Sequence, residues 1–172
     1  MALWLIRHTA PDIPPGICYG QSDVALAASF ETDAQAVIAA MPNATTIITS
    51  PLQRCQRLAG KIAASLNIPI KADKSLMEMD FGAWEGRPWD HIPRHEIDQW
   101  AADFWHAKPH GGESVCDLKT RADFALQTVA SAYENAAVVT HAGIIKAAFA
   151  TGTTADAFNR SPAFGEIVEW EG

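Results

Sequence analysis

Residues 3–9, Leu-Trp-Leu-Ile-Arg-His-Thr, decide how the fold of this chain is interpreted. The apolar residues form a short continuous run, a pattern typical of a strand that is covered on both faces in a mainly parallel sheet. The run ends at Arg7 and His8, and open α/β sheets bind their ligands where the strands end. The pair therefore predicts an anion site, unless both side chains are simply the first solvated residues after the strand.

A second strand is expected at residues 45–49, where β-branched residues predominate. Ser50-Pro51 follows, and we expect a helix there with Ser50 as its N-cap and Pro51 as its first residue. Apolar residues then recur with the period of a buried helical face as far as Leu66. Arg54 falls in the first turn of this helix, near the positive end of its dipole.

A third strand, expected at residues 136–140, ends at His141, and another helix is expected directly after it. Taken singly, an arginine in a first helical turn is usually solvated, and a histidine after a buried strand is usually a satisfied core residue. The carboxyl ends of parallel strands, however, meet at one edge of a sheet. We therefore expect the four cation-capable side chains Arg7, His8, Arg54 and His141 to converge there.

The other elements can be placed from periodicity and from turn residues. They are a Pro- and Gly-rich loop at 9–24, a helix at 27–41, a strand at 68–72, an irregular segment at 76–87, a partly helical Trp-rich stretch at 88–107, a helix at 115–133 and an antiparallel edge strand at 167–170. This alternation predicts an α/β fold, a three-layer α/β/α sandwich with a mainly parallel central sheet.

Length and composition favour one globular domain over residues 1–172, because 48% of the residues are hydrophobic and 19% are charged. The net charge of −7 and the absence of basic blocks argue against a nucleic-acid partner. Membrane insertion is not expected either, since no apolar run approaches the roughly 18 residues that a span requires. Met1 leads into the first strand without an export leader, so the expected location is the cytoplasm.

Neither the cysteines nor the histidines suggest a metal centre. The three cysteines are odd in number and form no C-x-x-C, which argues against disulfides and thiolate zinc sites and suits a reducing cytoplasm. His91 and His95 have the spacing of a helical metal pair, but Pro93 lies between them and the glutamate of the H-E-x-x-H motif is missing. No metal and no cofactor are predicted.

Four stretches, 5–8, 50–55, 76–86 and 139–143, resemble the motifs of the histidine phosphatase (phosphoglycerate mutase-like) superfamily, and they occur in the family order. The resemblance covers nearly the whole chain. Within the superfamily, residues 18–26 together with residues 78–86 are most similar to α-ribazole phosphatases. The resemblance implies a phosphoglycerate mutase-like fold and a metal-independent phosphomonoesterase, with α-ribazole 5′-phosphate of cobalamin biosynthesis as the expected substrate.

The resemblance also implies roles for five residues. His8 is the nucleophile and becomes phosphohistidine, while Arg7, Arg54 and His141 bind the phosphoryl oxygens. Arginine suits that task because its paired N–H groups match phosphate geometry. Glu78 gives a proton to the leaving alkoxide and later acts as base toward water. His8 must be neutral to attack, whereas His141 is most useful when protonated.

The substrate contacts expected beyond the phosphate are Gly20, Gln21 and Trp84. The aromatic segment at about 84–110 is either a lid over the flat base of the substrate or a small satellite core. Glu85 is either a second acid or a structural carboxylate.

The chain departs from the family pattern at Thr9, which replaces the usual glycine after the catalytic histidine and could place a hydroxyl near the phosphate. It also lacks room for the insertions of the mutases, which favours hydrolysis over transfer. A broad-specificity small-molecule phosphatase and a phosphohistidine protein phosphatase are alternatives, although an imidazole leaving group has no need of Glu78. A catalytically dead binding module is a further alternative, against which the retention of all five site residues argues.

Overall fold

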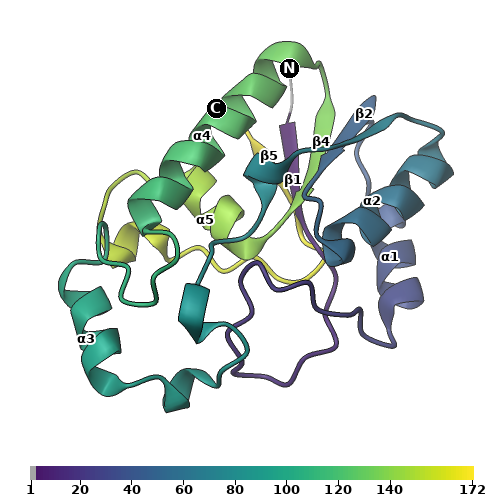
Figure 1. The fold of residues 1–172 in the computed structure, drawn as a ribbon. Coiled ribbons are helices and arrows are strands. Elements are labelled where there is room, and N and C mark those ends of the chain that lie inside the picture. Colours follow the sequence, from purple (N-terminus) through teal and green to yellow (C-terminus); the bar gives the residue numbers. More distant parts are fainter. Residues whose placement is uncertain (1–2) are drawn as a thin grey trace.

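The central sheet has five strands in the order β3-β2-β4-β1-β5 (Figure 1). The strands are β1 Leu3–Arg7, β2 Thr46–Thr49, β3 Ile70–Ala72, β4 Ala136–Thr140 and β5 Ile167–Trp170. The first four are parallel, and β5 pairs antiparallel with β1 at the edge. The computed structural model describes residues 3–172, so the first two residues of the expected 1–172 domain lie outside it. The predicted mainly parallel sheet with an antiparallel edge strand is confirmed.

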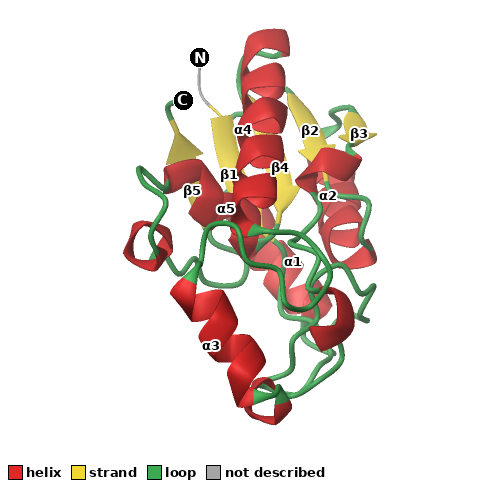
Figure 2. Ribbon diagram, turned by 60° about the vertical axis from the view of Figure 1, so that its left-hand side comes forward, coloured by secondary structure: helices red, strands yellow, loops and turns green. Residues whose placement is uncertain are grey.

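Helices cover both faces of this sheet, as Figures 1 and 2 show. Their bounds are α1 Phe30–Ala39, α2 Gln53–Leu66, α3 Arg94–Ala102, α4 Val115–Ala132 and α5 Ala142–Phe149. One face packs against α1 and α2, and the other against α4 and α5. The three-layer α/β/α arrangement is therefore confirmed. None of the helices within residues 3–172 is long and apolar enough to cross a membrane.

Strand β1 serves both layers because successive side chains of a strand point to opposite faces. Leu3 and Leu5 belong to the core under α4 and α5, whereas Ile6 belongs to the core under α1 and α2. The main-chain N–H of His8 donates to the Thr140 carbonyl at 3.0 Å, so β1 and β4 end at the same level. This register places both strand ends at one edge of the sheet.

The start of α2 differs from the prediction. The helix begins at Gln53, after Leu52 at the N-cap position, and no side chain caps it. Ser50 instead lies 2.8 Å from the His141 ring through its hydroxyl and accepts the Leu52 N–H at 3.3 Å. The expectation of a Ser50 cap was wrong because the tertiary contact with His141 occupies the hydroxyl. Arg54 still lies in the first turn, as predicted.

The Trp-rich stretch forms a separate small core beneath the carboxyl ends of the strands (Figure 1). This aromatic cluster consists of Cys18, Phe81, Trp84, Trp89, Ile92, Ile97 and Trp100. Three short 3₁₀ turns, Lys74–Leu76, Gly82–Trp84 and Trp89–His91, accompany it, and a fourth at Ala155–Phe158 lies near the C-terminus. Of the two interpretations of the stretch, the satellite core agrees with this packing.

Candidate active site

The two histidines predicted to converge do so at the ends of β1 and β4. The ring centroids of His8 and His141 are 5.2 Å apart in an edge-to-face arrangement, and both side chains are buried. His141 immediately precedes α5, so its position follows from the strand-to-helix turn. The parallel register of the sheet thus brings together residues that are far apart in the sequence.

His8 is held in one tautomer by the main chain. Its Nδ1 lies 2.7 Å from the Thr9 carbonyl oxygen, and a carbonyl can only accept, so Nδ1 carries the hydrogen. The lone pair then resides on Nε2. Burial lowers the pKa of His8 to about 3, and Arg54 and Arg7 act in the same direction against the hydrogen bond to Thr9. His8 is therefore a neutral imidazole with a free Nε2, the form that a nucleophile requires.

Arg54 is a fully buried cation without a carboxylate partner. Its Nη1 and Nη2 donate to the carbonyls of Ser22 and Gly20 at 2.8 and 2.6 Å, while its Nε has no hydrogen-bond partner. It forms no ion pair among the described residues. A buried charge is costly unless an opposite charge accompanies it, so this guanidinium is suited to an anionic ligand.

Arg7 lies under the C-terminal segment that precedes β5. It donates from Nη1 to the Pro162 carbonyl at 2.7 Å, and its guanidinium carbon is 3.8 Å from the centroid of the Phe164 ring. Phe164 also lies 5.7 Å from the His8 ring. As with Arg54, Nε of Arg7 is buried without a partner, and so is the hydroxyl of Thr9. Three donors of the site are therefore buried and have no hydrogen-bond partner among residues 3–172.

The charge of His141 depends on its buried surroundings. Burial first, and then the nearby Arg54 and His8, hold the pKa of His141 well below its usual value. The ring is therefore neutral in this structure, and its protonation beside a bound phosphoryl group stays a prediction. A phosphoryl dianion beside His141 would oppose these cations and favour the charged form.

The Glu78 carboxylate lies against the start of α5. Its Oε1 accepts the Met79 N–H at 2.8 Å and its Oε2 accepts the Gly143 N–H at 3.0 Å. A Cβ at position 143 would overlap this carboxylate, so glycine is required there for the close approach. Since α5 starts directly after His141, the same turn positions the predicted acid and the second histidine.

Arg121 of α4 supports the Glu78 segment, and sequence reasoning did not find it. Its guanidinium donates to the carbonyls of Ser75, Met77 and Glu78 at 2.8, 2.7 and 2.9 Å. It also forms a two-pronged ion pair with Glu113, at 2.6 and 2.9 Å. No local motif identifies such a residue, because its partners lie on a distant irregular segment. Arg121 is a positioning residue for Glu78.

Glu85 is a structural carboxylate. It accepts the main-chain N–H groups of Gln21 and Ser22, both at 2.8 Å, and also the Ser22 hydroxyl. A Cβ on Gly20 would overlap Glu85, and Gly20 has a positive φ of 33°. Glu85 therefore fixes the loop whose carbonyls hold Arg54.

The predicted substrate contacts have different surroundings. Gln21 donates from Nε2 to the Glu78 carbonyl at 3.0 Å, and Gly20 lies beside Arg54, so both are near the site. Trp84 is fully buried in the aromatic cluster, and its indole N–H donates to Glu96 at 2.6 Å. Trp84 packs against the rings of Trp89, Trp100 and His110, so its predicted contact with the substrate stays a prediction. Within the described part of the chain, no three His, Cys, Asp or Glu side chains are arranged to hold a metal ion.

Comparison with known proteins finds that the chain is similar to phosphatases and to a probable phosphoglycerate mutase. The chain is 28% identical over 154 residues to the adenosylcobalamin/α-ribazole phosphatase of Escherichia coli. The aligned residues are 84% of this chain and 75% of the relative. It is 36% identical over 113 residues to a probable phosphoglycerate mutase of Klebsiella pneumoniae, or 62% of this chain and 52% of the relative. The solved α-ribazole phosphatase of Shigella flexneri shares the fold, with a TM-score of 0.83, 24% identity, and coverage of 98% of this chain and 89% of that one.

A family model matches a continuous range that contains all four motif stretches. The model of the histidine phosphatase superfamily (branch 1) matches residues 3–163, which include all four motif stretches and both histidines of the site. This chain therefore belongs to the histidine phosphatase superfamily, branch 1.

Proposed function

We propose that the protein is a metal-independent phosphomonoesterase that works through a phosphohistidine on His8. One observation carries this proposal: a neutral, buried His8 with a free Nε2 lies beside two guanidiniums that have no carboxylate partner among residues 3–172. Arg7 and Arg54 would neutralise the phosphoryl dianion, the task that metal ions perform in two-metal phosphatases.

In the first half-reaction, Nε2 of His8 attacks phosphorus and the ester P–O bond breaks. The leaving oxygen takes a proton from the Glu78 carboxyl, so the products are the alcohol, phosphohistidine and the Glu78 carboxylate. Because an alkoxide is a poor leaving group, this proton matters most for alkyl esters. The arginines and His141 stabilise the charge on the equatorial oxygens as it develops.

In the second half-reaction, a water molecule gives a proton to the Glu78 carboxylate as its oxygen attacks phosphorus. The P–N bond breaks, inorganic phosphate leaves, and the electron pair returns to Nε2 of His8. Glu78 is then protonated again, so each turnover restores both groups.

For the substrate we propose α-ribazole 5′-phosphate, an intermediate of cobalamin biosynthesis, handled in the cytoplasm. The likeness of residues 18–26 and 78–86 to α-ribazole phosphatases supports this choice, as does the name of the Escherichia coli relative. Residues 1–172 would act as one domain, in which the segment at about 84–110 packs as a small core and also acts as a cap, since its Trp100 and Phe104 line the cavity beside Glu78.

The test is a comparison of kcat/KM for α-ribazole 5′-phosphate, 3-phosphoglycerate and simple sugar phosphates with the purified protein. We expect the riboside phosphate to be hydrolysed most efficiently. Comparable efficiencies for the riboside phosphate and 3-phosphoglycerate would refute the substrate and leave the phosphatase chemistry in place. Lack of hydrolysis of every ester, including p-nitrophenyl phosphate, would refute the phosphatase itself.

A further inference from the structure

A cavity of about 340 Å³ lies beside Glu78. Much of its wall is aromatic and comes from Phe81, Trp100, Phe104 and Phe158. Among the residues that line it, Glu78 and Lys146 are the charged ones. Such a cavity suits an apolar group that approaches the carboxylate of Glu78.

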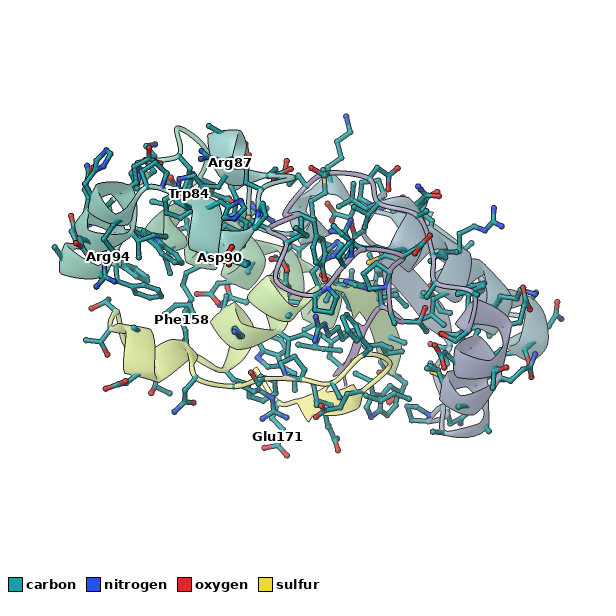
Figure 3. All side chains as sticks on the ribbon, turned by 90° about the horizontal axis from the view of Figure 1, so that it is seen from below. Trp84, Arg87, Asp90, Arg94, Phe158 and Glu171 are labelled. Atoms are coloured by element: carbon teal, nitrogen blue, oxygen red, sulfur yellow. The ribbon has the colours of Figure 1, made fainter. Side chains whose placement is uncertain are left out.

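The cavity is assembled from segments that are distant in the sequence. Phe158 belongs to the 3₁₀ turn at Ala155–Phe158 and points toward the segment that contains α3, as Figure 3 shows. Its ring centroid lies 5.5 Å from that of Phe104, just after α3. Gly143, which donates to Glu78, lines the cavity as well. The predicted acid Glu78 therefore borders the same cavity as aromatic rings from separate segments, and residues of α4 and α5 complete the lining.

We propose that this cavity binds the leaving group of the substrate and selects phosphate esters whose alcohol carries a flat, uncharged, apolar body. The inference rests on the proposed function, because it requires Glu78 to protonate the leaving oxygen. An atom group bonded to that oxygen must extend away from Glu78, and the cavity is the space that Glu78 borders. Aromatic walls favour flat groups, which gain both buried area and ring–ring contact.

Lys146 is the positively charged residue of the cavity lining, and it could instead bind an anionic group on the substrate. It lies on α5 close to Gly143 and lines the same cavity. A carboxylate on the leaving group, such as that of 3-phosphoglycerate, would lose its hydration among the rings and would depend on Lys146 for compensation. An uncharged leaving group would not depend on this lysine.

The experiment uses two esters with chemically similar leaving oxygens, 2-phenylethyl phosphate and glycerol 1-phosphate. Both need a proton from Glu78, and they differ in the apolar body. We expect the wild-type protein to have the higher kcat/KM for 2-phenylethyl phosphate.

Ala155 is an exposed residue that lines the cavity. The substitution Ala155→Phe can therefore fill the cavity without altering the sheet core.

Ala155→Phe should lower kcat/KM for 2-phenylethyl phosphate by about tenfold or more, a typical penalty for a group that no longer fits a hydrophobic pocket. The value for glycerol 1-phosphate should change less than about twofold, since a small polar body makes few contacts with these walls. Thr153→Phe, an exposed residue of the same segment that does not line the cavity, is the matched control and should affect neither ester.

Equal losses for both esters in Ala155→Phe, or no loss for either, would overturn the inference. So would a preference for 3-phosphoglycerate over 2-phenylethyl phosphate that disappears in Lys146→Leu, because the cavity would then be an anion subsite. Phosphohistidine formation on His8 from p-nitrophenyl phosphate in Ala155→Phe separates this failure from that of the proposed function. If no phosphohistidine forms even in the wild type, the proposed function fails and this inference fails with it.

Discussion

The phosphoryl end and the leaving-group end of the site are built in different ways. At the phosphoryl end, polar side chains follow directly from strand ends and a helix start, and buried donors such as Nε of Arg54 have no partner. At the other end, aromatic rings from separate segments surround a cavity beside Glu78. In the proposed mechanism, strand register therefore positions the groups that act on the phosphate, whereas the packing of irregular segments forms the cavity for the leaving group.

Loss of His8 should have the largest effect and should not distinguish between esters. His8→Ala removes the nucleophile, so kcat should fall by at least about 10⁴-fold for alkyl and aryl phosphates alike. Steady-state assays with 2-phenylethyl phosphate and p-nitrophenyl phosphate measure this. His106→Ala, at an exposed histidine, is the control and should retain full activity. Substantial turnover in His8→Ala would exclude His8 as the nucleophile.

Loss of the predicted acid Glu78 should affect alkyl phosphates much more than p-nitrophenyl phosphate. Glu78→Gln cannot give a proton to an alkoxide, so kcat/KM for alkyl phosphates should fall by about 10²- to 10⁴-fold. p-Nitrophenyl phosphate, whose leaving group hardly needs a proton, should lose much less. The ratio of the two losses, measured with one protein preparation, is the observable. Equal losses on both esters would exclude Glu78 as the acid.

Arg121→Met tests whether Glu78 depends on its support. Four hydrogen-bonded groups lose their partner, including the Glu78 carbonyl and the Glu113 carboxylate. We expect alkyl phosphates to lose about tenfold more than p-nitrophenyl phosphate, since a misplaced acid harms only the step that needs a proton. Lys119→Met, which breaks another ion pair on α4, is the matched control. A uniform loss on both esters would indicate a general structural role instead.

Burial of His8 should also make the free energy of unfolding depend on pH. Burial lowers the pKa of His8 from 6.5 to about 3. Between these values the unfolded chain binds a proton at this position that the folded protein does not bind. The free energy of unfolding therefore falls as the pH decreases from about 6.5, by at most about 1.4 kcal/mol per pH unit for one histidine.

His8→Gln should flatten this dependence. Urea unfolding of the wild type and of His8→Gln at pH 7.5, 6.5 and 5.5 measures the difference (these are about the pH values over which a histidine titrates). Burial is the main cause of the lowered pKa of His141 and His8 a lesser one, so His141 contributes in the same direction in both proteins and most of its contribution cancels in the comparison. Identical slopes would mean that His8 is not held neutral by burial.

The smallest effect is expected from chelation. In the proposed mechanism, Arg7 and Arg54, which form no ion pair among residues 3–172, supply the positive charge at the phosphoryl end, so dialysis against EDTA should change kcat by less than about twofold. Recovery of a lost activity by a divalent ion would contradict the metal-independent mechanism. The assay with p-nitrophenyl phosphate suffices for this measurement.

Most of the phosphoryl end could be predicted from the sequence, because each residue is adjacent to an element that periodicity identifies. Arg7 and His8 follow β1, and His141 follows β4. The cap of α2 could not be predicted, since the Ser50 hydroxyl contacts His141 from another strand. Local sequence preference for a cap is weaker than such a tertiary contact.

The leaving-group end could be predicted much less well. Trp84 was expected at the substrate because tryptophans gather in that stretch, yet its ring is the buried centre of the aromatic cluster. The cavity combines Trp100 with Phe158 of a turn that carries no motif, and Arg121 supports Glu78 from α4. These contacts join irregular segments, for which neither a helical nor a strand period exists to indicate which side chain faces which.

Trapping the phosphoenzyme tests the central claim most directly. The wild-type protein is mixed with p-nitrophenyl phosphate, quenched in alkali, which preserves phosphohistidine, and digested for peptide mass spectrometry. A phosphoryl group on His8 that is absent from His8→Ala is the predicted result, because the hydrogen bond from Nδ1 to Thr9 leaves Nε2 free to attack. Turnover without any phosphoryl group on His8, or with the group on another residue, would contradict the account.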